Sequence, residues 1–182
     1  MIEFTTATNQ TDLLQILELQ RQNLPEKLSE TDKKEQGFVT VRHDLEILQK
    51  MNDVHPHIIA KNDNKIIGYA LSMSKNFRND IPILISMFDE IDTTSKGAKP
   101  YLLMGQVCID KNFRGKDIFR GLYAKMKKEF TGIYDCIITE IDEKNTRSIN
   151  AHKAIGFKTL KTYTSNNQDW EIVYLNIQTV SS

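Results

Sequence analysis

The sequence contains no apolar run long enough to span a bilayer, and its start lacks the basic segment and apolar core of a secretory signal. We therefore expect a cytoplasmic protein with no membrane contact. The chain also has no excess charge, since 24 Lys and Arg residues balance 24 Asp and Glu residues. This balance gives the protein as a whole no electrostatic attraction for nucleic acid, so we expect no nucleic-acid partner and only local binding of anions.

Cysteine is scarce, and the histidines do not cluster. Cys108 and Cys136 lie in apolar segments typical of strands, where reduced, packed thiols are expected more often than a disulfide or a catalytic pair. The sequence has no HExxH motif, and we predict no metal site. Its 182 residues, of which 40% are hydrophobic, fit one domain over residues 1–182.

Strand and helix patterns alternate along the chain. Strands are predicted at 1–6, 101–109, 134–141, 157–164 and 169–177, with a hairpin over 57–74. Helices are predicted at 9–24, with Thr11 as its cap, and at 44–51, 80–91, about 115–130 and 145–155. This order predicts an α/β (α+β) domain with a mixed, mainly antiparallel sheet flanked by helices.

A basic turn follows the strand "YLLMGQVCI" and precedes a helix that begins near Gly115. The first amides of a helix have no partner within the helix, and the helix dipole adds positive charge there, so such a turn suits a phosphate group. The basic residues of the turn are Lys111, Arg114, Lys116 and Arg120, and only Asp110 and Asp117 oppose them. A solvated basic helix face would give the same pattern, so this stretch leaves both interpretations open.

A second motif, "NTRSINAHKAIGF", follows the strand "YDCIITEI". Asn145 is a good N-cap, and Ser148 and His152 follow on the same stripe of the helix. Taken alone, these residues are more typical of a cap, a small packing residue and a partly buried histidine than of a functional site.

Together the two motifs resemble the GNAT superfamily of acetyl-CoA-dependent N-acetyltransferases, and the resemblance extends from Ile2 to about Ile177. In that family the amides of the first motif bind the pyrophosphate of CoA, and the second motif lies beside the thiol. The first motif corresponds here to Arg114, Gly115, Lys116, Asp117, Ile118 and Phe119, and the second to Asn145, Ser148, His152, Gly156 and Phe157.

The resemblance implies a role for each of these residues. Acetyl-CoA would be held by Val107, Cys108, Ile109, Arg114, Gly115, Lys116, Asp117, Ile118, Phe119, Arg120, Asn145, Ser148 and His152. His152 replaces the tyrosine that commonly protonates the departing thiolate, a task that histidine can perform near neutral pH. Glu140 is the nearest candidate for the base by topology, although a solvated strand end is the more ordinary interpretation.

Asp117 and Phe119 depart from the family, which usually has Gly, and Gly or Ala, at these positions so that phosphate can approach the backbone. The aspartate could repel the pyrophosphate, or it could cap the helix. These departures favour one alternative to an enzyme, namely a CoA-binding or regulatory module without turnover.

We predict acetylation of a primary amine on a small molecule or peptide. By resemblance, the acceptor site includes residues 24–57, where Phe38, Arg42 and His43 are the candidate contacts, although a core anchor for the loop is the more ordinary role for Phe38. Glu30, Glu35 and Asp44 could hold a cationic amine. The sequence leaves open whether the protein forms a homodimer.

Overall fold

In the computed structural model, residues 1–24 and 41–178 are described. The strands are β1 (Ile2–Thr6), β2 (Ile58–Asn62), β3 (Lys65–Met73), β4 (Tyr101–Ile109), β5 (Cys136–Asp142), β6 (Lys158–Ser165) and β7 (Gln168–Asn176). They form one sheet in the order β1-β2-β3-β4-β5-β7-β6. Only β4 and β5 run parallel, so the prediction of a mixed, mainly antiparallel sheet is confirmed.

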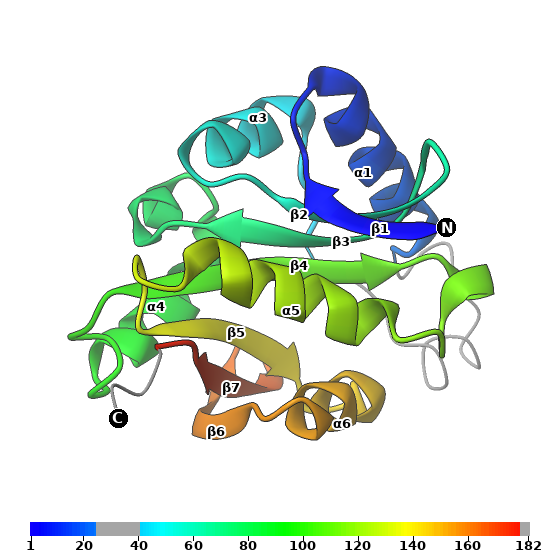
Figure 1. The fold of residues 1–182 in the computed structure, drawn as a ribbon. Coiled ribbons are helices and arrows are strands. Elements are labelled where there is room, and N and C mark those ends of the chain that lie inside the picture. The colour runs from blue at the N-terminus through cyan, green and yellow to red at the C-terminus, as the bar shows by residue number, and fades with distance from the viewer. Residues whose placement is uncertain (25–40, 179–182) are drawn as a thin grey trace.

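Helices cover both faces of this sheet (Figure 1). They are α1 (Gln10–Gln22), α3 (Leu45–Val54), α4 (Ile85–Asp92), α5 (Ile118–Phe130) and α6 (Thr146–Ala154), with short 3-10 turns η2 (Lys75–Asn79), η3 (Pro82–Leu84) and η4 (Lys111–Phe113). The apolar residues of α1, α3 and α4 form one core with one face of the sheet. The apolar residues of α5 pack on the opposite face, together with Phe157 beyond the end of α6. Burial of both sheet faces is the dominant stabilising contribution to this arrangement.

Local sequence accounts for the hairpins and the helix ends. Asn166 and Asn167 have φ of 54° and 59°, as the tight turn between β6 and β7 requires. Asn145 caps α6 as predicted, because its side chain accepts a hydrogen bond from the Ser148 amide. The predicted cap of α1 was wrong, since Asn9 and not Thr11 accepts the bond from the helix amides. Asn9 can adopt the extended backbone that an N-cap needs, one residue before the helix begins.

β4 and β5 separate halfway along their length. Their pairing ends at Leu103 and Ile138, although β4 continues to Ile109 and β5 to Asp142. The register of β4 against β3 also shifts by one residue between the pairs Ala70–Val107 and Ser72–Met104, so β4 carries a β-bulge there. The backbone groups of β4 that face the gap therefore have no strand partner among the described residues. The candidate functional site lies at this gap.

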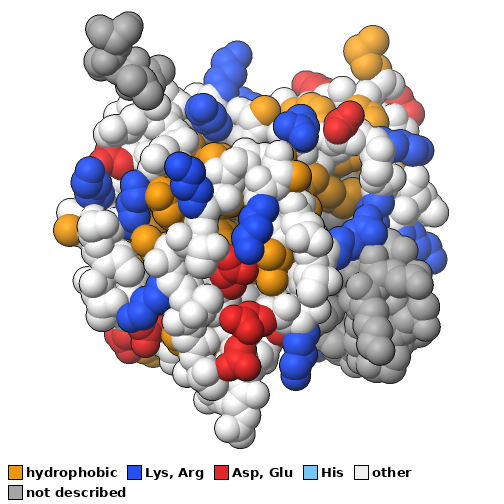
Figure 2. All heavy atoms as spheres, turned by 90° about the horizontal axis from the view of Figure 1, so that it is seen from below, with side chains coloured by type: hydrophobic (Ala, Val, Ile, Leu, Met, Phe, Trp, Pro, Cys, Tyr) orange, Lys and Arg blue, Asp and Glu red, His pale blue; other side chains and the backbone are white. Residues whose placement is uncertain are grey.

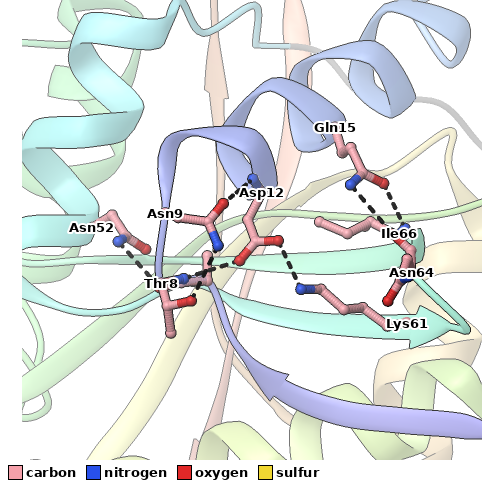
Figure 3. Close-up of polar contacts among 9 residues, drawn as sticks. Thr8, Asn9, Asp12, Gln15, Asn52, Lys61, Asn64 and Ile66 are labelled. Atoms are coloured by element: carbon pink, nitrogen blue, oxygen red, sulfur yellow. Dashed lines mark hydrogen bonds and ion pairs between the residues drawn. The ribbon is translucent and has the colours of Figure 1, made fainter.

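The start of α1 is tied to the sheet by polar contacts (Figure 3). Asp12 is only 2% exposed, and its carboxylate accepts the Thr8 amide proton at 3.1 Å and pairs with Lys61 of β2 at 2.7 Å. Gln15 accepts the amide proton of Ile66, the second residue of β3, at 2.9 Å. These bonds fix the direction of α1, whose other end lies at the site.

We expect Asp12→Ala to lower the free energy of unfolding by about 2–4 kcal/mol, because it leaves the Lys61 ammonium and the Thr8 amide without their buried partner. The matched control is Glu18→Ala, which removes an exposed carboxylate paired with Arg21 on the same helix. Urea denaturation should show a much smaller loss for the control. Equal losses in the two variants would show that Asp12 does not anchor the helix.

Candidate functional site

A cleft of about 330 Å³ opens where β4 and β5 separate. It is lined by Asn23, Val107, Cys108, Ile109, Arg114, Gly115, Asp117, Ile118, Phe119, Arg120, Asn145, Arg147, Ser148, Ala151, Ala154 and Ile155. The view from below shows a hollow with hydrophobic side chains in its floor and Lys and Arg side chains near its rim (Figure 2). The end of β4, the start of α5 and one side of α6 thus form a common wall, as the two motifs predict.

The turn before α5 presents helix amides that have no hydrogen-bond partner among the described residues and can bind an anion. Gly115 has φ of +74°, and an added Cβ there would meet no atom within 4 Å, so the backbone is open to an approaching group. Asp117 is in the left-handed conformation with φ of 57°, and its side chain makes no capping bond to α5. The carboxylate is exposed and lies 4.0 Å from Arg120. Of the two roles considered for Asp117, capping is therefore not observed, and the first amides of α5 keep their capacity to bind phosphate.

The cations of the turn are used in different ways. Arg114 lines the cleft, and its guanidinium also donates to Asn23 at the end of α1 at 2.8 Å and to the Ile109 carbonyl at 3.2 Å. It therefore links the turn to α1 as well as adding positive charge. Lys116 lies over the Phe113 ring at 5.0 Å and is not among the described residues that line the cleft. Arg120 lines the cleft as predicted.

The side of α6 that faces the cleft is wider than the sequence motif suggested. Asn145 and Ser148 line it as predicted, and Arg147, Ala151, Ala154 and Ile155 were missed. Ala151 and Ile155 follow Ser148 at spacings of three and seven residues, so the helical period could have identified them. The small side chains of the two alanines leave room for a ligand. Arg147, which belongs to the second motif, adds a cation to those of the turn.

His152 is not among the described lining residues of the cleft, although it lies one helical turn from Ser148 and its ring packs edge-on against Phe119, and both of those residues do line it. It is 1% exposed, its Nε2 lies 2.6 Å from the Tyr123 hydroxyl of α5, and its Nδ1 lies 2.7 Å from the Ser148 carbonyl. The carbonyl can only accept, so Nδ1 carries the proton and Nε2 accepts from Tyr123. Burial lowers the pKa of His152 to about 4, which keeps the ring neutral at pH 7. The role of proton donor stays a prediction, and this geometry supports instead a residue that holds α6 against α5.

We therefore expect His152→Phe to lower the free energy of unfolding by about 1–3 kcal/mol, because the Tyr123 hydroxyl loses its buried acceptor. Tyr123→Phe breaks the same hydrogen bond from the other side and should show a comparable loss. The kcat and the dissociation constant of acetyl-CoA should change by less than about threefold in both variants. A hundredfold fall in the kcat of His152→Phe with unchanged stability would restore His152 as the acid.

Glu140 of β5 lies two residues beyond the last pair with β4 and is half-buried rather than a solvated strand end. Its carboxylate accepts a hydrogen bond from the Tyr163 hydroxyl of β6. Burial raises the pKa of Glu140 to about 7, and the bond from Tyr163 opposes that shift. A carboxyl group poised near neutral pH beside the strand gap is suited to accept a proton.

A second cavity, of about 340 Å³, contains two of the three residues predicted for the acceptor. It is lined by Val41, Arg42, His43, Asp44, Ile47, Asp80, Ile81, Pro82 and Ile83. Asp44 also caps α3 through the Ile47 amide at 2.9 Å. Phe38, Glu30 and Glu35 lie outside the described residues.

The model of the acetyltransferase (GNAT) family matches residues 13–157, which include both motifs and the strand gap. The chain belongs to the GNAT acetyltransferase family. Enzymes of this family use acetyl-CoA, and the uncapped amides of α5, the open backbone at Gly115 and the cations of the cleft fit its pyrophosphate. No curated protein matches the sequence of this acetyltransferase.

Solved structures agree with this fold at low sequence identity. The ribosomal-protein-S18-alanine N-acetyltransferase of Escherichia coli is 10% identical to this chain. Its TM-score is 0.66, and the alignment covers 100% of this chain and 97% of the Escherichia coli chain. The yncA protein of Salmonella typhimurium, solved with its cofactor acetyl-CoA, is 13% identical, with a TM-score of 0.64 over 100% and 96%. An N-acetyltransferase of Staphylococcus aureus Mu50 is 16% identical, with a TM-score of 0.63 over 97% and 99%.

Two further features concern the described residues alone. None of their helices is both long and apolar enough to cross a membrane. The two cysteines are free and buried, as predicted. Burial raises the pKa of Cys108 to about 12, so the thiol in the cleft wall is not a nucleophile near neutral pH.

Proposed function

We propose that this GNAT acetyltransferase transfers the acetyl group of acetyl-CoA to a primary amine of a small molecule or peptide by direct attack. The observation that carries the proposal is the gap between β4 and β5, which is flanked by the uncapped start of α5 and by Glu140. The neutral amine nitrogen bonds to the thioester carbonyl carbon, and the C–S bond breaks. Glu140 takes the single proton that the nitrogen loses and later returns it to water, and the leaving thiolate takes up one proton from water.

Different parts of the site bind the pyrophosphate, align the thioester and accept the proton. The amides at the start of α5, with Arg114 and Arg120, hold the pyrophosphate. The unpaired backbone of β4 in the gap, beyond Met104, supplies amide groups that can align the pantetheine arm and polarise the carbonyl. Glu140 must be ionised to accept the proton, and a pKa of about 7 makes that state available at physiological pH.

The acceptor enters through the second cavity, which lies on the opposite side of β4 from the motif helices. Gln106 of β4 donates to the Val41 carbonyl in the wall of that cavity at 2.7 Å, and its neighbour Val107 lines the cleft. The Gln106 side chain therefore links the wall of the second cavity to β4 beside the cleft. An amine in the second cavity would reach the thioester from the face that carries Glu140.

Release of free thiol from acetyl-CoA, measured with a panel of primary amines, tests this function. Mass spectrometry of the products should show an acetyl group on the amine nitrogen. Binding of acetyl-CoA without thiol release on any amine of the panel would favour the alternative of a module without turnover. A catalytically silent protein that also failed to bind acetyl-CoA would remove the assignment of the cleft.

A further inference from the structure

A buried hydrogen-bond network connects the second cavity to the bulge of β4. Its side chains are Gln20 of α1, Tyr69 of β3, Gln106 of β4 and His43, and each is at most 7% exposed. Gln20 Nε2 lies 3.0 Å from both His43 Nδ1 and Gln106 Oε1, while the Tyr69 hydroxyl donates to Gln106 Oε1 at 2.6 Å. Burying this many polar atoms together is stable only when each atom has a defined role as donor or acceptor.

Two backbone groups fix the orientation of both amides. The His43 amide can only donate, and it bonds to Gln20 at 2.9 Å, so that atom of Gln20 is the oxygen. The Val41 carbonyl can only accept, and it bonds to Gln106 at 2.7 Å, so that atom of Gln106 is the nitrogen. Gln20 must then present its NH₂ group to the oxygen of Gln106 and to His43 Nδ1.

The tautomer of His43 follows from this orientation. Its Nδ1 accepts a proton from the amide of Gln20, so the ring proton of the neutral imidazole is on Nε2. Burial lowers the pKa of His43 to about 4, and the ring is therefore neutral near pH 7. His43 Nε2 is buried and has no hydrogen-bond partner among the described residues. An orphaned buried donor is costly unless a ligand supplies an acceptor.

His43 is part of the wall of the second cavity, whose other lining is largely apolar, through Val41, Ile47, Ile81, Pro82 and Ile83. Among the described lining residues, the carboxylates of Asp44 and Asp80 outnumber the one cation, Arg42, and this balance disfavours a ligand carboxylate. An uncharged oxygen fits both the neutral donor and these neighbours. The cavity volume of about 340 Å³ is at the small end for ligand sites.

We propose that His43 Nε2–H donates a hydrogen bond to a neutral carbonyl oxygen of the acceptor, which makes the preferred substrates primary amines that carry a carbonyl and an apolar group. The inference rests on the proposed function, because it assigns the second cavity to the amine. His43 is a specificity residue in this scheme. The network through Gln20 and Gln106 sets the direction of its donor and couples it to the strand that borders the thioester.

The first test needs no ligand. Nitrogen NMR of protein labelled at histidine should show, at pH 7, a His43 ring protonated at Nε2 and unprotonated at Nδ1. His43→Phe assigns the signal, and Gln20→Leu, which removes the donor to Nδ1, should perturb it. A His43 ring protonated at Nδ1 in the wild type would overturn the proposal.

The second test compares two probes, leucinamide and 3-methylbutylamine, which share the amine and the branched chain and differ in the carboxamide. Calorimetry in the presence of CoA should show leucinamide binding weakened about five- to tenfold by His43→Phe, as expected for one hydrogen bond. Binding of 3-methylbutylamine should change by less than about twofold. Acetyl-CoA affinity, measured in parallel, verifies that the variant is folded.

An equal effect of His43→Phe on both probes, or a failure of leucinamide to bind, would overturn the proposal. This readout is binding and not turnover. If neither leucinamide nor any other amine releases thiol from acetyl-CoA, the proposed function fails, whichever way the two probes bind. The two failures are thus distinguishable.

Discussion

Glu140→Gln should lower kcat about 100-fold or more while the affinity for acetyl-CoA stays unchanged, because the variant keeps the shape of the side chain and cannot accept a proton. The wild type should also show a rate that depends on pH. With a pKa of about 7, Glu140 is increasingly protonated below that pH, so the rate should fall as pH decreases and level off above it. A weakly basic amine, which stays neutral over the range scanned, keeps the ionisation of the substrate out of the profile.

Tyr163→Phe is the control that tests the direction of the expected pH shift. The Tyr163 hydroxyl donates to the carboxylate of Glu140 and so favours its ionised form, which opposes the effect of burial. Without this bond the inflection of the rate profile should move to higher pH, with the plateau reached later. A profile with no inflection near neutrality in the wild type, or a Glu140→Gln enzyme of normal kcat, would remove Glu140 as the base.

Gly115→Val should raise the dissociation constant of acetyl-CoA about 10- to 100-fold, since charge-assisted bonds from the turn amides contribute about 1.5–3 kcal/mol. A β-branched residue is strained at a φ of +74°, and its side chain would occupy the open space above the turn. Isothermal titration calorimetry measures the change directly.

Gly132→Val is the matched control, because it imposes a similar cost in backbone strain. Gly132 follows the other end of α5, has φ of +87° and equally open space at its Cβ, and is not among the described residues that line the cleft. Both variants should lose about 1–2 kcal/mol of stability from the left-handed backbone. Only Gly115→Val should bind acetyl-CoA more weakly. Matching affinities in the two variants would show that the turn does not hold the pyrophosphate.

Most of the fold and the phosphate turn could be predicted from the sequence, because they depend on local signals. Hydrophobic periodicity predicted the strands and helices in order, and the Asn-rich turn predicted the last hairpin. The turn at Gly115 and the cap at Asn145 are recognisable because glycine conformation and capping are set by residues only a few positions apart. The family resemblance rests on these same short motifs.

The chemistry of individual side chains was decided by the tertiary structure. The helix stripe placed His152 beside Asn145 and Ser148, but the hydroxyl that engages it belongs to Tyr123, 29 residues away, and burial between two helices sets its pKa. Glu140 looked like a strand end, and its pKa of about 7 depends on burial and on Tyr163 of another strand.

By itself the sequence determined the order of the elements, the turn that we propose binds phosphate, and the family, since each of these is encoded over a few consecutive residues. Only the tertiary structure decided that β4 separates from β5, and that Gln20 and Gln106, 86 residues apart, together fix the proton of His43. The physical reason is that pKa values, tautomers and strand gaps depend on which distant groups exclude water from one another, and no periodicity along the chain records that.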